Sequence, residues 1–452
     1  MKLAPYPRIM ATAALALVCA TATFSNEVRH LKLEEAVRLA LEQNRVLKIA
    51  RFKVKENEER KAGARSDYFP TITNQSNALH ISELQNIVIP VGALGNVSGT
   101  LIPSENVNLQ QGKQTLISSG TMITQPLTQL LRVRQANRAA SAEIAASKDD
   151  LKSAENEIAL KVHALYFGIL IGQLQKKAAE QETAFASESL RERQDDIRGG
   201  SALPVAEIQG QAEFLQGRQS VLTADLQIQD YTTELNDLLG LPLDTRLELD
   251  TDIATDFPIL SKADYIKVAW GENPEIRAAE QVVEKARAGV SAAKTAYIPD
   301  ITAYARHSYQ DGVPFLVRNF GTVGINLNYT LWDFGKRRSA VRERSTQLAE
   351  AEENLERLRE QVGVEVERSY NKMERTKSMV EVATQVAKLR QESERLTTDQ
   401  AAQGVVLVSD VRHAAAANYK AKADLLQASL GYLLAHAELE RSVGRAPGLG
   451  AP

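Results

Sequence analysis

Residues 44–73 read NRVLKIARFKVKENEERKAGARSDYFPTIT, and residues 273–302 read NPEIRAAEQVVEKARAGVSAAKTAYIPDIT. The two stretches align without a gap at a constant offset of 229 residues, and both end in the pattern Tyr-x-Pro-x-Ile-Thr. Self-similarity at one fixed offset indicates a duplicated structural unit. The sequence therefore predicts two copies of one unit, rather than the roughly three independent domains that the chain length alone suggests.

A second register, with an offset of 204 residues, continues the match through the rest of each copy. It pairs Leu127 with Leu331, Tyr166 with Tyr370, Gly200 with Gly404, Leu203 with Leu407, Leu235 with Leu439, and Gly240 with Gly444. The two offsets differ by 25 residues, which places one insertion of that length between Pro70 and Leu127. The expected organisation is a first copy at 23–242, a connecting segment at 243–263, a second copy at 264–444 and a tail at 445–452.

Each copy contains a long helical segment with a seven-residue apolar repeat. The repeating residues are Ile144, Leu151, Ile158 and Leu165, interleaved with Ser147, Ala154 and Val162, and at the related positions Leu348, Leu355, Val362 and Ser369, interleaved with Ala351, Leu358 and Val366. No proline interrupts residues 128–198, so a rise of 1.5 Å per residue gives a helix of about 105 Å. A seven-residue stripe on a helix of that length favours coiled-coil packing.

The long helices end at glycine residues. Gly200 allows a left-handed backbone at the end of the first helix, and Pro204 suits the first turn of the helix that follows. Gly404 occupies the related position in the second copy. The sequence therefore predicts two helical hairpins with tips at residues 199–207 and 403–411.

Residues 322–331 follow the two-residue period of a β-strand. The apolar face consists of Val323, Ile325, Leu327, Tyr329 and Leu331. Ten residues is about the length that a tilted strand needs to cross a bilayer. A half-buried strand of a soluble sheet has the same pattern, but four strands between such long helices have no second layer to pack against. We therefore expect β-hairpins at 71–127 and 300–331, facing lipid and closed into a barrel by several chains.

The connections inside the two hairpins, residues 82–113 and 310–319, are expected to be loops, the longer one rich in glycine, proline and asparagine. Two interpretations stay open for them. They are either surface hairpins without a specific partner, or elements that contact a receptor or phage or cap the pore.

The N-terminal residues 1–22 have the features of a secretory signal peptide. Lys2 and Arg8 precede a short apolar core, and the small residues 20–22 form a cleavage site. Cys19, the single cysteine, leaves lipid anchoring as an alternative, although Ala16-Leu17-Val18 fits a lipidation motif poorly. Cleavage after Ala22 gives a mature chain without thiol chemistry. We find no run of 18 apolar residues that predicts a transmembrane helix.

Composition and motifs argue against an enzyme. With 54 Lys and Arg against 57 Asp and Glu, the chain has no excess of positive charge for binding nucleic acid. It has no phosphate-binding GxxxxGK[ST] loop, GxSxG elbow or HExxH pair, and its six histidines stand far apart. Glutamates such as Glu350, Glu353 and Glu356 lie beside Arg357 and Arg359, which indicates a solvated coiled-coil face. We expect no catalytic, cofactor or metal site.

The duplicated unit of helix, two strands, long helix and helix, with Tyr68-Phe69-Pro70 and Tyr297-Ile298-Pro299 at the helix-to-strand corners, resembles TolC-like outer-membrane efflux proteins. Leu331-Trp332-Asp333-Phe334-Gly335 is also similar to that family. The resemblance covers residues 33–444. It implies a mainly α fold with a β-barrel portion, in which a homotrimer supplies four strands per chain to a twelve-stranded barrel in the outer membrane of a Gram-negative-type bacterium. The long helices would form a coiled-coil tunnel through the periplasm.

The same resemblance implies partners and a gate. The hairpin tips, with Gly199, Gly200, Leu203, Gly404 and Leu407, would contact a periplasmic adaptor protein that connects to an inner-membrane pump. Family members close their constriction with acidic residues just inside the second tip and an arginine shortly before them. In this chain Asp410 keeps the first acidic position, His413 replaces the second, and Val406 stands where the arginine would be. The alternative role of Asp410 is to stabilise a helix N-terminus.

These observations predict a passive exit duct whose driving force comes from a pump elsewhere. The alternative is a periplasmic coiled-coil scaffold, anchored through Cys19 and without a pore. Drugs, small metabolites and secreted polypeptides all remain open as the exported substrate.

Overall fold

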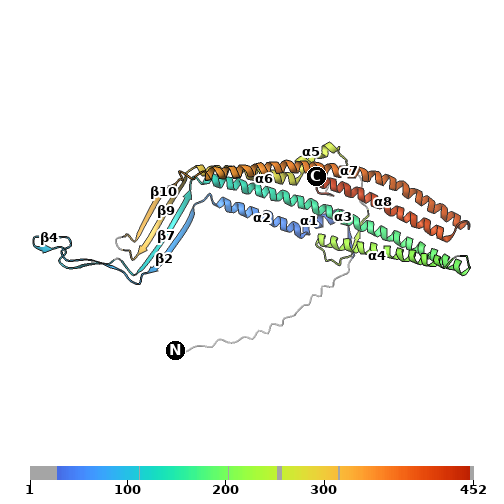
Figure 1. Ribbon diagram of the computed structural model, residues 1–452, viewed down its shortest axis with the longest axis horizontal. Coiled ribbons are helices and arrows are strands. Elements are labelled where there is room, and N and C mark those ends of the chain that lie inside the picture. The colour runs from blue at the N-terminus through green and yellow to red at the C-terminus, as the bar shows by residue number, and fades with distance from the viewer. Residues whose placement is uncertain (1–27, 111, 202, 252–256, 314–315, 448–452) are drawn as a thin grey trace, which may run out of the picture.

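The computed structural model describes residues 28–110, 112–201, 203–251, 257–313 and 316–447. The expected signal peptide and Cys19 lie outside the described residues. Figure 1 shows a long helical body with a strand sheet at one end and two helical hairpins at the other.

At each point along its length the helical body is a single row, four helices wide. Its helices are α1 (Leu33–Gln43), α2 (Arg45–Ser66), α3 (Leu130–Arg198), α4 (Val205–Leu239), α5 (Lys262–Glu272), α6 (Pro274–Lys294), α7 (Lys336–Ala402) and α8 (Val408–Val443), with a short 3-10 turn, η1 (Thr295–Tyr297). In the half next to the sheet, α2, α3, α6 and α7 pack in that order. In the far half the order is α4, α3, α8 and α7. The 69 residues of α3 agree with the length expected from the proline-free segment.

The sheet has four antiparallel strands in the order β10, β9, β7, β2. They are β2 (Thr71–His80), β7 (Thr115–Pro126), β9 (Asp300–Asp311) and β10 (Asn319–Asn328). Each strand continues from, or into, the helix at the same position in the row, so strands and helices share one lateral order. The molecule is therefore one layer, four elements wide, with β2, α2 and α4 along one edge and β10 and α7 along the other (Figure 1).

The predicted lipid-facing strand ends three residues early. The last pair of its ladder joins Asn328 to Asp300, the first residue of β9, so residues 329–331 have no strand beside them. Of the five predicted lipid-facing residues, Tyr329 and Leu331 therefore lie beyond β10. Tyr329 instead packs under the Arg337 guanidinium, 5.4 Å from the ring centroid. The strand thus starts three residues before the alternating run 322–331 and stops three residues before its end.

The segment expected to be a loop at 82–113 contains further strands. β3 (Asn86–Ile89) pairs with β6 (Val107–Gln110), and β4 (Asn96–Val97) pairs with β5 (Thr100–Leu101). In Figure 1 this arm projects beyond the four-stranded sheet. Ile87 pairs with Leu109 and Ile89 with Val107, which gives the β3–β6 ribbon one apolar face.

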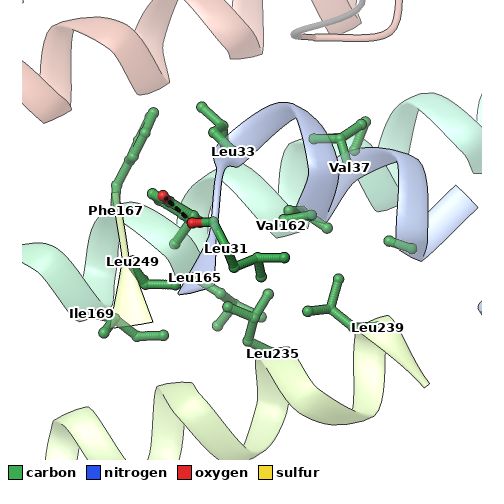
Figure 2. Close-up of a cluster of buried hydrophobic side chains, with 14 of the residues drawn as sticks. Leu31, Leu33, Val37, Val162, Leu165, Phe167, Ile169, Leu235, Leu239 and Leu249 are labelled. Carbon is green, nitrogen blue, oxygen red and sulfur yellow. Dashed lines mark hydrogen bonds between the residues drawn. The ribbon is translucent and has the colours of Figure 1, made fainter. Parts of the chain in front are cut away.

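The largest core cluster lies midway along the body, where α3 passes the short parallel strands β1 (Arg29–Leu31) and β8 (Leu247–Leu249). Figure 2 shows Val162, Leu165 and Ile169 of α3 facing Leu31 and Leu249. The buried Tyr166 hydroxyl donates to the Leu31 carbonyl at 2.9 Å or to the Asp250 carbonyl at 2.8 Å. These two strands lie outside the repeated pattern, and the sequence analysis did not predict them.

Two asparagines break the first helical segment of each copy at equivalent places. Asn44 accepts the backbone N–H groups of Val46 and Leu47, and its amide donates to the Leu238 carbonyl. Asn273 makes the same set of bonds to Glu275, Ile276 and Ser442. An asparagine at this position satisfies N–H groups that a helix start leaves free. The same contacts therefore fix the helix break in both copies.

Among the residues that the structure describes, one helix, α3, contains a window apolar enough by length and composition to cross a membrane. More than half of that window is buried inside the described chain. The sequence had predicted no such helix, and this window qualifies that prediction. However, apolar residues of α3 such as Ile158, Val162 and Ile169 belong to the buried core cluster. Core packing thus accounts for the apolar composition.

His436 on α8 is expected to make the protein less stable in acid. Its ring stacks on Phe257 with 3.6 Å between centroids, and burial lowers its pKa to about 4, although Glu440 lies 3.7 Å away. Unfolded histidine titrates near pH 6.5, so the unfolded state alone binds this proton between about pH 6.5 and 4. Stability should fall through that window, by up to about 3 kcal/mol, and level off below it.

The test of this prediction compares the melting temperatures of wild type and His436→Gln at pH 7 and pH 4.5. The melting temperature of the variant should fall less on acidification than that of the wild type. It should still fall to some extent, because burial also lowers the pKa of His163. Equal losses in the two proteins would contradict the role of His436.

Candidate functional site

One face of the sheet is apolar over the half of the β9–β10 ladder that lies nearest the helices. Val323, Ile325 and Leu327 are 85%, 71% and 63% exposed. Their partners across the ladder are Ala305, Ala303 and Ile301. A strand with such exposed apolar residues is typical of contact with lipid or with another chain. Three of the five residues predicted for lipid contact thus lie on this face.

On β2 and β7 the same face carries polar side chains that bond to one another. The Asn74 amide donates to the Thr121 hydroxyl at 2.8 Å, and the Ser76 and Ser119 hydroxyls lie 2.9 Å apart. In a membrane, polar groups have to find partners within the protein. These pairs allow that half of the face to be buried as well.

The opposite face of the sheet is polar and hollowed. A hollow of about 480 Å³ is lined mainly by polar side chains from all four strands. Two long side chains, Tyr304 and Arg306, lie there on glycines of neighbouring strands. A Cβ placed on Gly324 would meet the Tyr304 hydroxyl at 2.8 Å, and one on Gly120 would meet the Arg306 guanidinium at 3.0 Å. The sequence reading missed Arg306, although the alternation of β9 from Ile301 onward would have revealed it.

The junction between β10 and α7 exposes a group of apolar side chains, among them Leu331, Trp332 and Phe334. Arg337 fixes this turn, because its side chain bonds to Asp333 and its guanidinium lies over the rings of both Tyr297 and Tyr329. The turn therefore presents exposed aromatic rings on a rigid base beside the apolar strand.

The two hairpin tips sit together at the far end of the body. Gly200 and Gly404 have positive φ angles of 78° and 73°, whereas Gly199 has an ordinary helical φ of −76°. Leu203 and Leu407 are exposed at the tips. The tips thus offer apolar side chains to solvent at repeat-related positions.

At the second tip, Asp410 caps its own helix. Its carboxylate accepts the backbone N–H of Leu407 at 3.1 Å, while the side chain stays exposed. His413, one turn later, packs its ring against Phe185 of α3 at 5.1 Å. The Glu192 carboxylate of α3 accepts the N–H of Ser409 at 3.1 Å, and so joins the two hairpins. Nothing in the sequence pattern had singled out Glu192.

Both edges of the helical row carry exposed apolar stripes. On α4 the stripe contains Val205, Ile208, Leu215, Leu222 and Leu226. On α7 it contains Met379, Val382, Val386, Leu389 and Leu396. The spacings of three, four and seven residues are those of a coiled-coil seam without its partner helix. Within the described chain, α4 packs on α3, and α7 packs on α6 and α8, while both stripes stay exposed.

Comparison with known proteins gives one consistent result. The family model described as outer membrane efflux protein matches residues 36–241 and 265–445. The alkaline protease secretion protein AprF of Pseudomonas aeruginosa is 24% identical over 307 residues, which is 66% of this chain and 63% of AprF. The match thus spans less than two thirds of that relative's length.

Two solved structures have a similar fold. The CmeC outer membrane channel of Campylobacter jejuni is 15% identical and superposes with a TM-score of 0.74, covering 93% of this chain and 87% of CmeC. The outer membrane protein VceC of Vibrio cholerae is 16% identical with a TM-score of 0.72, covering 92% and 96%.

Proposed function

The chain belongs to the outer membrane efflux protein family, and from that premise we propose that it is the outer-membrane exit duct of a tripartite export system. The observation that carries the proposal is the single layer with two open edges. A strand edge exposes unpaired backbone groups, and an apolar stripe on a helix exposes a seam, so both need a partner. Copies of the same chain supply it, since β2 with α4 can meet β10 with α7 of the next copy.

Closure by three copies gives a homotrimer with a twelve-stranded barrel. The apolar outward face, with Val323, Ile325 and Leu327, then contacts outer-membrane lipid, and the polar hollow becomes the wall of a lumen. The helices continue the lumen as a tunnel through the periplasm. The closed barrel satisfies every strand edge, which a single chain cannot do.

The hairpin tips are the proposed docking site for a periplasmic adaptor, which would connect the duct to an inner-membrane pump. The exposed Leu203 and Leu407 support this role, since apolar side chains at an exposed tip gain from burial against a partner. AprF is named as a protease secretion protein, which makes polypeptide export one candidate activity for this chain.

Asp410 is the proposed gate residue, with His413 one turn further along α8. In a closed trimer three Asp410 carboxylates would meet near the axis. The structure of the single chain also gives Asp410 a capping role through Leu407, so the two roles need separate variants.

Reconstitution into planar bilayers tests the function, and two variants test the gate. We expect the wild type to form trimers that migrate in a heat-modifiable way and conduct ions. Asp410→Ala should raise the conductance several-fold. Asp410→Asn should raise it as well, because asparagine keeps an oxygen for the Leu407 N–H and loses only the charge.

An Asp410→Asn variant that behaves as wild type while Asp410→Ala opens would assign Asp410 to the cap alone. A wild-type protein that stays monomeric and does not conduct would overturn the duct and favour the scaffold.

A further inference from the structure

We propose that Arg306 makes the strand-lined section of the duct selective for anionic solutes. The inference rests on the proposed function, because it takes the polar hollow as a lumen wall. Arg306 lies in the middle of β9, where its neighbours across the ladders are Met122 and Thr322.

Charge on this face is scarce. In the register of the four described strands, the side chains on the face of Arg306 include Thr73, Gln75, Ser308 and Thr322, which are uncharged. Asp300 is the one other ionised residue on that face of the strands, six residues before Arg306 at the helical end of β9. At 3.3 Å per residue the two Cα atoms are about 20 Å apart, which is more than a Debye length in physiological salt.

No described carboxylate lies within salt-bridge distance of Arg306, and its side chain is exposed on the hollow. The other cations at this end of the sheet are different. Arg318 and Lys113 both pair with Asp311 at the rim, at 3.3 and 2.8 Å. A solute in the hollow therefore meets the positive charge of Arg306, which no described carboxylate nearby neutralises.

Gly120 determines where that charge sits. The Arg306 guanidinium lies so close to Gly120 that a Cβ there would be 3.0 Å from Nη2 and 3.2 Å from Nε. The absent side chain lets the guanidinium lie on the wall rather than reach across the lumen. The placement of Arg306 on Gly120 therefore adds positive charge to the wall while keeping the passage open.

Three copies would place three such charges at one level of the barrel. Rings of arginine or lysine favour anions in pores, because charge of one sign within low-dielectric walls raises the local concentration of the opposite ion. The favoured class of solute is therefore anionic: small organic acids or acidic segments of polypeptides.

The test measures the reversal potential of reconstituted trimers in a KCl gradient at low salt. Arg306→Gln should lower the ratio of chloride to potassium permeability by about threefold or more, with the difference shrinking at 1 M KCl. Arg318→Gln removes a positive charge from the same hairpin that is already paired with Asp311, and should change the ratio much less. The measurement is repeated in the Asp410→Ala background, so that carboxylates at the tip do not mask the barrel.

A second variant guards against faulty assembly. Arg306→Cys should lose the anion preference, regain it on reaction with a positively charged methanethiosulfonate, and reverse it with a negatively charged one. Conducting trimers of Arg306→Gln with wild-type selectivity, or Arg306→Cys channels insensitive to the charge of the reagent, would overturn the role of Arg306. A wild type that does not conduct would instead overturn the duct itself.

Discussion

Leu389→Glu is expected to abolish the trimer while leaving the chain helical. Leu389 is 72% exposed in the single chain and lies in the apolar stripe of α7, so a polar residue there costs the isolated chain little. In the proposed trimer the same position is buried against α4 of the next copy. The variant trimer loses about 1.5–3 kcal/mol of association free energy per copy from apolar burial, and it also pays the larger cost of burying an unpaired carboxylate.

The measurement is size-exclusion chromatography with light scattering in detergent, together with circular dichroism. Two controls separate the seam from a general effect of substitution. Leu389→Met conserves volume and should keep the trimer. Lys388→Glu adds negative charge one residue away, off the stripe, and should keep it too. A trimeric Leu389→Glu would place the contact between copies elsewhere.

Periodicity made the main elements predictable. The seven-residue stripe and the absence of proline indicated α3, and buried Val362 and Val366 of α7 fit the stripe of the second copy. The strand pattern at Val323, Ile325 and Leu327 was equally readable. Its end was not, because residues 329–331 keep the alternation after the partner strand has stopped. Strand ends depend on pairing, which one strand's own sequence does not contain.

Other parts depend on contacts between distant segments. The pairing of β1 with β8 joins residues about two hundred positions apart, and three-residue strands carry almost no periodic signal. Glu192 is one of many glutamates on long helices, and only the packing of α3 beside α8 brings it to Ser409. Arg306 was readable from alternation, but its seat on Gly120 follows from the register of β7 and β9.

Gly444→Ala is expected to cause the largest loss of stability among substitutions at the helix ends. Gly444 ends α8 with a φ of 104°, and an added Cβ would lie 2.6 Å from the Asn273 Cα and 2.8 Å from the Pro274 Cδ. Both are atoms of the helix break that Asn273 organises, so they cannot move aside as a flexible side chain could. The left-handed strain alone costs about 1–2 kcal/mol, and we expect a total of about 3 kcal/mol or more.

Two related glycines provide graded controls. Gly404 has a φ of 73° with nothing within 4 Å of an added Cβ, so its alanine variant should show the strain alone. Gly240, the repeat-related partner of Gly444, has a φ of 69° and would meet the Gln43 Cβ at 3.2 Å, which is an intermediate case.

Thermal unfolding in detergent should therefore rank the alanine variants of Gly404, Gly240 and Gly444 in order of increasing loss. The ranking separates two costs that one variant would confuse, because all three residues share the left-handed backbone and differ in what surrounds them. If Gly444→Ala were no worse than Gly404→Ala, the close approach of α8 to the Asn273 break would not contribute to stability. The expected order instead means that the end of α8 can lie this close to the start of α6 only because Gly444 has no side chain. The Gly444 carbonyl also accepts a hydrogen bond from the buried Asn156 amide of α3 at 2.7 Å, which holds the end of α8 in place.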